Sequence, residues 1–398
     1  MRVIYSLTAI VLSGLSVLVQ AKSTTGDRVL VLLDSLAEKE TYSQFWQQLE
    51  EGDLTRLIDR DFQLVFKAAD DQKTTLAYFG ETLYQHIIHF APSTSSLEKH
   101  PSLSNVQLVN FVNNGGNLLA AFNQPSDTLR ALAAEFDMDL ETEVRDQSAK
   151  LVGPKTIVDP EQISAPVKFT GAGLQVGKLP LSHAILASNN QALVGTLQSR
   201  NSARVAFAGS LSMFSNDYMN ADSTGNKAFV RQLSQWTFQE KSVLKVTQHG
   251  HHHLNDTEQP AWYRVKDEMV YYADIMEYKD DTWIPYEAND VQLEIIMLDP
   301  YIRTTLKSHN GRFEAQLRLP DVYGVFTLKV NYKRAGLSYL TAEDQVSIRP
   351  FRHNEYPRFL TAAYPYYAST LSMIVGFILF SAVWLSTWNQ EEKTKKKE

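Results

Sequence analysis

Cysteine is absent from all 398 residues of this chain. Its absence excludes disulfides, a cysteine nucleophile and every metal site built from thiolates. Positive charge is also in short supply, because 38 Lys and Arg face 45 Asp and Glu and the net charge is −7. Binding to nucleic acid needs a basic face, so we expect no nucleic-acid partner.

The residues that are present indicate a folded protein rather than a disordered one. Hydrophobic residues make up 44% of the chain and aromatic residues 11%, which argues against disorder. The length leaves room for two domains with accessory segments.

The N-terminus has the composition of a signal peptide, which we place at residues 1–21. A single basic residue, Arg2, precedes an apolar run from Val3 to Val19, and Ala21 offers a small residue before a cleavage site. An uncleaved membrane anchor is the alternative. Serine, threonine and glycine within the run favour cleavage.

A second apolar segment lies near the C-terminus, where no charged residue falls between Arg358 and Glu391. Residues 367–388 would rise about 33 Å as a helix, which is enough to cross a hydrocarbon core of about 30 Å. Tyrosines precede this stretch and tryptophans close it, as at membrane interfaces. We predict a membrane-spanning helix, and the alternative is a buried core helix.

The two ends together predict the topology. A signal peptide would export the bulk of the chain, so we expect a single-pass type I membrane protein with a juxtamembrane segment at 351–366 and a cytosolic tail at 389–398. In that tail Lys396 and Lys395 are third and fourth from the C-terminus. This spacing resembles the dilysine signal that returns membrane proteins to the endoplasmic reticulum. A plain basic flank is the alternative.

Residues 22–240 read as one luminal α/β domain with a mostly parallel sheet. The run Arg28–Asp34 is continuously apolar before its final aspartate, as expected of a strand buried on both faces. Further runs of this kind alternate with amphipathic segments. Such alternation is typical of βαβ units. The other predicted strands and helices include Phe62–Lys67, His86–Phe90, the helix Asn105–Asn114, Arg204–Ala208 and the helix Ala228–Phe238.

Residues 241–350 show a different period. The runs RFEAQLRL and VFTLKVNYK alternate strictly between apolar and polar side chains, and the segment PDVYG between them supplies a turn. We predict an antiparallel β-sandwich domain over these residues.

Two short motifs suggest metal chemistry, and each has a simpler interpretation. Asp137 and Asp139 match the DxD pattern of glycosyltransferases, but solvated carboxylates at a helix end explain them better. His249 and the run His251–His253 have side chains of the ligand type, but adjacent side chains diverge. We interpret this cluster as a polar loop at the domain junction. We predict no metal or other cofactor.

Two single residues are candidates for function. Asp34 follows the first strand, where parallel sheets place ligand-binding residues; a helix-capping role explains it equally well. Asn255 begins the only Asn-x-Thr or Asn-x-Ser triplet, which the expected topology would expose to glycosylation. No combination of residues forms a recognisable catalytic constellation.

The predicted spanning helix carries small residues at every fourth position, Ala368, Ser372 and Gly376. Such a face allows another helix to approach closely in lipid. We interpret it as a helix-packing surface, and the alternative is the ordinary content of small residues in membrane helices.

Four long blocks of this sequence resemble the family of 48-kilodalton subunits of the eukaryotic oligosaccharyltransferase. They are VLVLLDSL, DVQLEIIMLDPYIRTTL, LPDVYGVFTLKVNYKRAGLSYL and RPFRHNEYPRFLTAAYPYYAS. With the signal, the span and the dilysine tail in matching places, the resemblance covers essentially the whole chain.

The resemblance implies a place in a complex of the endoplasmic reticulum membrane. That complex moves a preassembled oligosaccharide from dolichyl diphosphate to the Asn of Asn-x-Ser/Thr triplets. The family relation implies an amidotransferase-like N-terminal fold, whose usual cysteine nucleophile is missing here. The chemistry belongs to another, multi-spanning subunit. The expected partners are that catalytic subunit, a ribophorin-type subunit, a defender-against-death-type subunit and membrane lipid.

Three alternatives stay open for the crevice of the α/β domain: it contacts the dolichol-linked oligosaccharide, the acceptor peptide or only protein. Two competing functions also stay open. One is a free-standing luminal hydrolase that uses the crevice near Asp34. The other is a cargo receptor that cycles between the Golgi and the endoplasmic reticulum.

Overall fold

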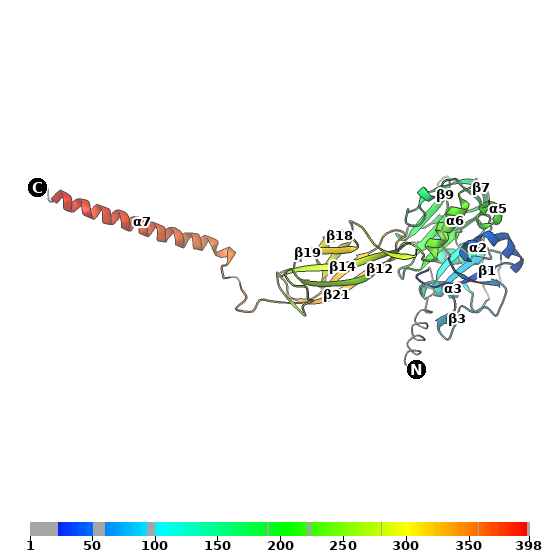
Figure 1. Ribbon diagram of the computed structural model, residues 1–398, viewed down its shortest axis with the longest axis horizontal. Coiled ribbons are helices and arrows are strands. Elements are labelled where there is room, and N and C mark those ends of the chain that lie inside the picture. Colours follow the sequence, from blue (N-terminus) through cyan, green and yellow to red (C-terminus); the bar gives the residue numbers. More distant parts are fainter. Residues whose placement is uncertain are drawn as a thin grey trace, which may run out of the picture.

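The computed structural model of this protein describes residues 23–50, 60–93, 100–188, 191–220, 224–279, 281–356 and 358–395. Three parts follow one another along the chain and in space: an α/β domain, a β-sandwich and a long helix (Figure 1). The signal peptide expected at residues 1–21 lies outside the described residues.

The α/β domain is built on a nine-stranded sheet, of which five strands run parallel. Their residues face helices on both sides, which is why each strand reads as an unbroken apolar run. In spatial order they are β2 (Gln63–Ala68), β1 (Arg28–Leu33), β5 (His86–Phe90), β6 (Asn117–Ala121) and β11 (Arg204–Ala208). The expected parallel sheet is therefore present in this half.

The other half of the sheet is antiparallel, which makes the whole sheet mixed. Its strands are β10 (Gln191–Gln198), β8 (Val167–Val176), β7 (Met138–Leu151) and β9 (Ser182–Ser188). The chain passes from β8 to β9 and from β9 to β10 within a few residues. Such short connections cannot carry a crossover between parallel strands, so the chain reverses direction: β9 pairs antiparallel with β10, and β7 pairs antiparallel with β8 and β9.

Helices cover both faces of the parallel half. On one face α2 (Ser43–Glu50) and α6 (Asn226–Thr237) share a core with Val31, Phe90 and Ala206. The opposite face carries the other alternate residues of the same strands. They pack against α3 (Asn105–Asn113) and α4 (Asp127–Glu135), the latter capped by the Ser126 hydroxyl, which accepts from the Leu129 N–H at 3.3 Å.

Short elements complete this domain. The segment that follows Ser35 is a 3₁₀ helix, and α2 begins only at Ser43. The remaining pieces are η1 (Leu36–Tyr42), β3 (Ala77–Tyr78), β4 (Glu81–Thr82), η3 (Pro160–Gln162), η4 (Ser212–Phe214) and α5 (Asn216–Met219).

The second domain packs two five-stranded sheets around one apolar core. The first contains β12 (Val243–His253), β14 (Glu268–Lys279), β15 (Thr282–Pro285), β18 (Lys307–His309) and β19 (Arg312–Arg318). The second contains β13 (Tyr263–Arg264), β16 (Gln292–Ile296), β17 (Pro300–Thr305), β20 (Gly324–Tyr332) and β21 (Leu340–Arg349). The predicted turn after β19 carries the chain from one sheet to the other.

The C-terminal part is helix α7 (Tyr364–Lys395), preceded by the turn η5 (Thr361–Ala363). Residues Thr361–Thr387 have a mean hydropathy of 2.0, and none of that stretch is buried within the chain. Among the described helices it alone is long and apolar enough to span a bilayer.

Candidate functional site at the domain junction

The two domains are joined by a loop at residues 334–339, which we call the junction loop. It connects β20 to β21 and enters the α/β domain, where Leu337 and Ser338 are buried. Three successive carbonyls of the loop accept hydrogen bonds from α/β side chains: Thr156 Oγ1 donates to Ala335 O at 2.8 Å, Trp236 Nε1 to Gly336 O at 2.7 Å, and Gln198 Nε2 to Leu337 O at 2.5 Å.

Gly336 is needed at the centre of this loop for two reasons. Its φ is +77°, a conformation that other residues adopt at a cost. A Cβ placed there would lie 2.2 Å from Thr156 Oγ1 and 2.7 Å from a side-chain carbon of Ile157. The backbone can approach the α/β domain this closely only because the side chain is missing.

Buried Arg204 holds the linker between the domains from inside the α/β domain. Its guanidinium donates to the Trp236 carbonyl at the end of α6 at 2.8 Å and to two linker carbonyls, those of Lys241 at 2.8 Å and Ser242 at 2.6 Å. It also lies 4.9 Å from the Trp236 ring centroid. Burial lowers the pKa of Arg204 to about 9, so the group stays cationic at neutral pH.

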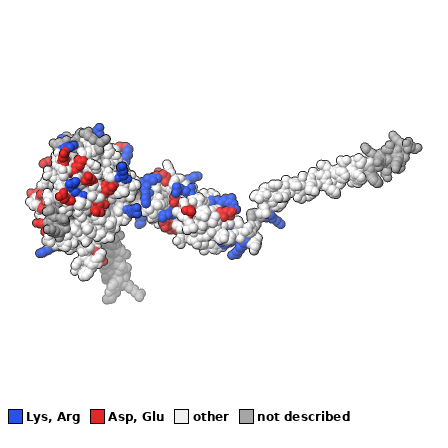
Figure 2. Space-filling model, turned by 180° about the vertical axis from the view of Figure 1, so that it is seen from behind, with Lys and Arg blue, Asp and Glu red and all other residues white. Residues whose placement is uncertain are grey.

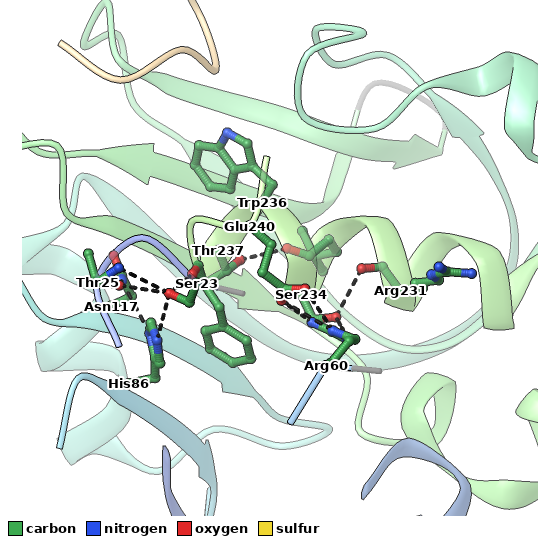
Figure 3. A network of polar contacts seen from close by, with 12 residues as sticks. Ser23, Thr25, Arg60, His86, Asn117, Arg231, Ser234, Trp236, Thr237 and Glu240 are labelled. Atoms are coloured by element: carbon green, nitrogen blue, oxygen red, sulfur yellow. Dashed lines mark hydrogen bonds and ion pairs between the residues drawn. The ribbon is translucent and has the colours of Figure 1, made fainter. Parts of the chain in front are cut away.

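The start of the described chain is tied into the same region. The Ser23 hydroxyl donates to Phe238 O at 2.6 Å and lies 3.2 Å from His86 Nε2, and His86 in turn lies 3.2 Å from Asn117 Nδ2 (Figure 3). His86, Asn117 and Arg204 are the first residues of β5, β6 and β11. The amino ends of three parallel strands therefore supply the polar groups of the junction.

A buried ion pair secures the other side of this network. Arg60 Nε lies 2.9 Å from a carboxylate oxygen of Glu240, and an Arg60 terminal nitrogen donates to Ser234 Oγ at 3.2 Å (Figure 3). The side chains of Arg60 and Glu240 are 1% and 7% exposed. Breaking such a pair leaves an unpaired buried charge, which makes the pair a strong positional constraint.

The opposite, carboxyl edge of the parallel strands holds the predicted crevice residue. Asp34 is half-buried after β1, and one of its carboxylate oxygens accepts from the Ser93 N–H at 3.3 Å. Burial and the neighbouring Glu38 and Asp34 carboxylates raise the pKa of Tyr42 to about 12. Beneath Asp34, burial lowers the pKa of His89 to about 4. This edge thus gathers an acidic group and a neutral histidine.

The two aspartates of the DxD motif do not form a shared site. Asp137 has a φ of +60° and accepts hydrogen bonds from the Leu179 N–H and the Ser182 hydroxyl, both at 3.2 Å. Asp139 lies 3.9 Å from Arg130. Asp137 clamps a loop, whereas the sequence suggested only solvated carboxylates.

The histidine cluster lies in strand β12, so its interpretation as a loop at the domain junction was wrong. His249 Nδ1 lies 2.7 Å from an Asp344 carboxylate oxygen, and His251 Nδ1 lies 2.8 Å from the Tyr263 hydroxyl. Both contacts reach from one sheet to the other. Pairing with β14 extends the strand through these residues, because cross-strand contacts outweigh local preference. In the described part of the chain no three His, Asp or Glu side chains are placed to hold a metal.

The remaining candidates lie at the far ends of the molecule. Asn255 is exposed in the turn after β12. Ala368, Ser372 and Gly376 are exposed on α7, and nothing lies within 4 Å of a Cβ built on Gly376. Lys395 ends α7, and Lys396 lies outside the described residues.

Sequence reasoning missed the junction because its groups are scattered over the chain. The loop sequence RAGLSYL carries no motif, and the side chains that bind its carbonyls lie 100 or more residues away. One local signal was available: Arg204 opens an otherwise apolar buried strand. A charge in that position needs several acceptors, and it therefore points to a polar network at the strand's start.

Two family models match this chain. The description "OST48, N-terminal domain" covers residues 20–194 and 182–240, and "OST48 middle domain" covers residues 251–388. The first match corresponds to the α/β domain, and the second runs from the end of β12 into α7.

Three relatives match this chain over nearly its full length, and each is a dolichyl-diphosphooligosaccharide–protein glycosyltransferase 48 kDa subunit. The Danio rerio protein is 34% identical over 95% of this chain and 96% of its own length. The Caenorhabditis elegans protein is 35% identical over 90% and 91%. The Arabidopsis thaliana protein is 35% identical over 91% and 93%.

Proposed function

This chain belongs to the family of 48 kDa subunits of dolichyl-diphosphooligosaccharide–protein glycosyltransferase, and from that premise we propose that it is a non-catalytic, scaffolding subunit of the complex. The complex would transfer a preassembled oligosaccharide from dolichyl diphosphate to Asn of Asn-x-Ser/Thr in nascent proteins. This chain would hold other subunits in position for that reaction, and bond-making would belong to a multi-spanning partner.

The junction is the observation that carries this proposal. Its hydrogen bonds are buried and join the two domains through backbone carbonyls, so the domains cannot rotate freely about their linker. An enzyme that closes around a substrate needs a hinge, whereas a scaffold needs a fixed distance between its ends. The buried hydrogen bonds of the junction fix the distance between the two ends of the body, as a scaffold requires.

The exposed α7 supports the same proposal. It makes no buried packing with the rest of the described chain, so in a membrane its contacts come from lipid and from other helices. We infer that the face of Ala368, Ser372 and Gly376 packs against another subunit's span. The catalytic subunit, a ribophorin-type subunit and a defender-against-death-type subunit are the partners we propose.

We further infer that the complex resides in the endoplasmic reticulum membrane with the two domains in the lumen. Asn255 would then be accessible to glycosylation, and Lys395 and Lys396 would act as a cytosolic retrieval signal. Changing both lysines to serine should move the chain to the Golgi. If luminal cargo is also lost while glycosylation stays normal, a cargo receptor is the better description.

Depletion and replacement of this chain test the scaffolding role. Depletion should leave glycoproteins underglycosylated and should dissociate the complex, and the wild-type chain should restore both. The Asp34→Asn variant should restore them equally well. A purified luminal body that turns over a substrate alone, and loses that activity with Asp34→Asn, would replace the scaffold by a hydrolase.

A further inference from the structure

The end of the sandwich remote from the junction loop carries a row of exposed apolar and aromatic residues, which we call the distal end. Tyr263 and Gly324 both pair with Ile348, and Ile296 pairs with Thr327. These registers place the ends of β13, β21, β20 and β16 side by side. Tyr323 and Leu298 lie just beyond the ends of β20 and β16, Arg349 is the last residue of β21, and Trp262 immediately precedes β13.

These side chains are unusually exposed for their size. Leu298 is 89% exposed, Tyr323 67% and Trp262 46%. The turn that carries Leu298 packs on the start of β20, because a Cβ on Gly324 would lie 2.7 Å from Met297 Sδ. Contiguous exposed apolar residues on a soluble face usually mark a binding surface.

The distal end is tethered closely to the membrane-spanning helix. After β21 the chain folds back instead of extending: Glu355 accepts from Arg349 at 2.7 and 2.8 Å and from the Arg352 N–H at 2.9 Å. The Phe351 and Tyr356 rings lie 5.5 Å apart. Five chain steps then separate Tyr356 from Thr361, which is at most about 19 Å.

The chemistry of this end suits the boundary between lipid and water. The Arg349 guanidinium stacks 4.0 Å from the Trp262 ring centroid. Tyrosine, tryptophan and arginine combine an apolar body with a polar tip, and they gather at the headgroup layer of membranes. Figure 2 shows basic side chains where the sandwich meets the helix, and Arg349, Arg352 and Arg358 lie in that part of the sequence.

From these observations we propose that the distal end docks on the headgroup layer of the same bilayer that α7 crosses. The occupant of the surface is lipid, because the short tether keeps Trp262, Tyr323 and Leu298 within reach of the membrane surface. This inference rests on α7 spanning the bilayer, as in the proposed function.

Docking would give the rigid body two attachments instead of one. A helix alone leaves the body free to tilt about its tether, whereas a second contact fixes its orientation. Strand β12 has 11 residues and spans about 36 Å, so the α/β domain would stand at roughly that height above the headgroups.

The absence of cysteine makes a direct test possible with the full chain. Single-cysteine variants Leu298→Cys and Tyr323→Cys are labelled with an environment-sensitive fluorophore and reconstituted into phosphatidylcholine vesicles. Lipids with a headgroup nitroxide should quench both labels, and aqueous iodide should quench them weakly. The matched control is Val152→Cys, on an exposed apolar residue of the α/β domain, where iodide should quench and the nitroxide lipid should not.

A third label, at Ser372→Cys in α7, separates the two ways of failing. If acyl-chain nitroxide does not quench this label, the span itself is wrong and the proposed topology falls with it. If Ser372 is quenched while positions 298 and 323 behave like 152, only the docking is overturned. In the intact complex, the labels at 298 and 323 could instead be blue-shifted and not quenched by lipid nitroxides. That result would assign the surface to a protein partner and would also overturn the proposal.

Discussion

At the scale of single residues, the charge most tightly constrained is that of Arg204. A guanidinium presents several N–H groups in a fixed plane, and here they reach the carbonyls of Trp236, Lys241 and Ser242 together. An ammonium group has no such fork. The residue therefore acts as a staple for the linker, and its identity matters more than its charge.

We predict that Arg204→Lys destabilises the two-domain body by about 3 kcal/mol, because buried carbonyls lose donors. The measurement is urea unfolding of the full chain in detergent, followed by tryptophan fluorescence. Exposed Arg200→Lys is the control and should change the free energy of unfolding by less than about 0.5 kcal/mol. If both variants changed the free energy of unfolding equally, the hydrogen bonds of the Arg204 guanidinium would contribute no specific stability.

Buried histidines predict how stability depends on pH. Burial lowers the pKa of His86 and of His89 to about 4, whereas an unfolded histidine titrates near pH 6.5. Between these values the unfolded chain binds more protons than the folded one, so stability falls as the pH falls from about 6.5 toward 4. Above about pH 6.5 the histidines are neutral in both states, so they no longer lower the stability of the fold.

We expect the urea midpoint to drop between pH 7 and pH 5, and His89→Leu to make that drop smaller. His89 Nδ1 has no hydrogen-bond partner among the described residues, so leucine sacrifices no bond at that atom. A midpoint that stays constant from pH 7 to pH 5 in the wild-type chain would mean that folding does not lower the pKa of either histidine.

At the scale of elements, the junction loop shows how a hairpin connection becomes an interdomain contact. Successive carbonyls at 335, 336 and 337 all point to donors of the α/β domain. A loop with this much buried backbone must find a partner for each polar group. Those partners, and the missing side chain at Gly336, hold the two domains at one angle.

We predict that Gly336→Ala weakens the junction more than Gly80→Ala weakens its own turn. Both glycines have positive φ, +77° and +87°, but only at Gly336 would a Cβ meet atoms within 4 Å. The difference between the losses in free energy of unfolding of the two variants therefore measures the packing penalty at Gly336, which we expect to be about 1–3 kcal/mol. Faster hydrogen exchange of the Ser338 amide, which donates to Ser242 O, is the local readout.

If Ser338 exchanges equally slowly in wild type and in Gly336→Ala, the loop tolerates the methyl group and the junction is less tightly packed than the contacts indicate. The Gly80→Ala variant should leave Ser338 exchange unchanged in either case, because Gly80 lies in the β3–β4 turn, outside the junction.

At the scale of the whole molecule, a rigid body on a single helix needs its domains on one side of the membrane. The exposed turn that holds Asn255 would then face the compartment in which glycosylation takes place. Because Asn255 begins the only acceptor triplet, it reports orientation without interference from a second site.

We predict one glycan on this chain, carried by Asn255. Asn255→Gln and Thr257→Ala should each migrate like the wild-type chain treated with a glycosidase that removes N-glycans. Wild-type chain that the glycosidase does not shift would contradict glycosylation. Protease protection of both domains in sealed microsomes then decides whether orientation or site access is responsible.

The sequence by itself determined the features that depend on local pattern. A stretch without charge long enough to cross a bilayer becomes α7, because no other structure satisfies its backbone in lipid. Apolar runs and strict alternation likewise distinguish the strands of the α/β domain from those of the sandwich. A strand buried on both faces is apolar at every position, whereas a strand buried on one face is apolar at every second position.

Only the tertiary structure decided which elements meet. The antiparallel half of the large sheet, the placement of β19 and β20 in different sheets, and the strand through His249 and His251 all depend on pairing between distant segments. The junction is the clearest case, since Trp236 and Gly336 meet only after both domains form. A local pattern states which face of an element is buried, but hydrogen-bond and packing partners are chosen by the folded chain as a whole.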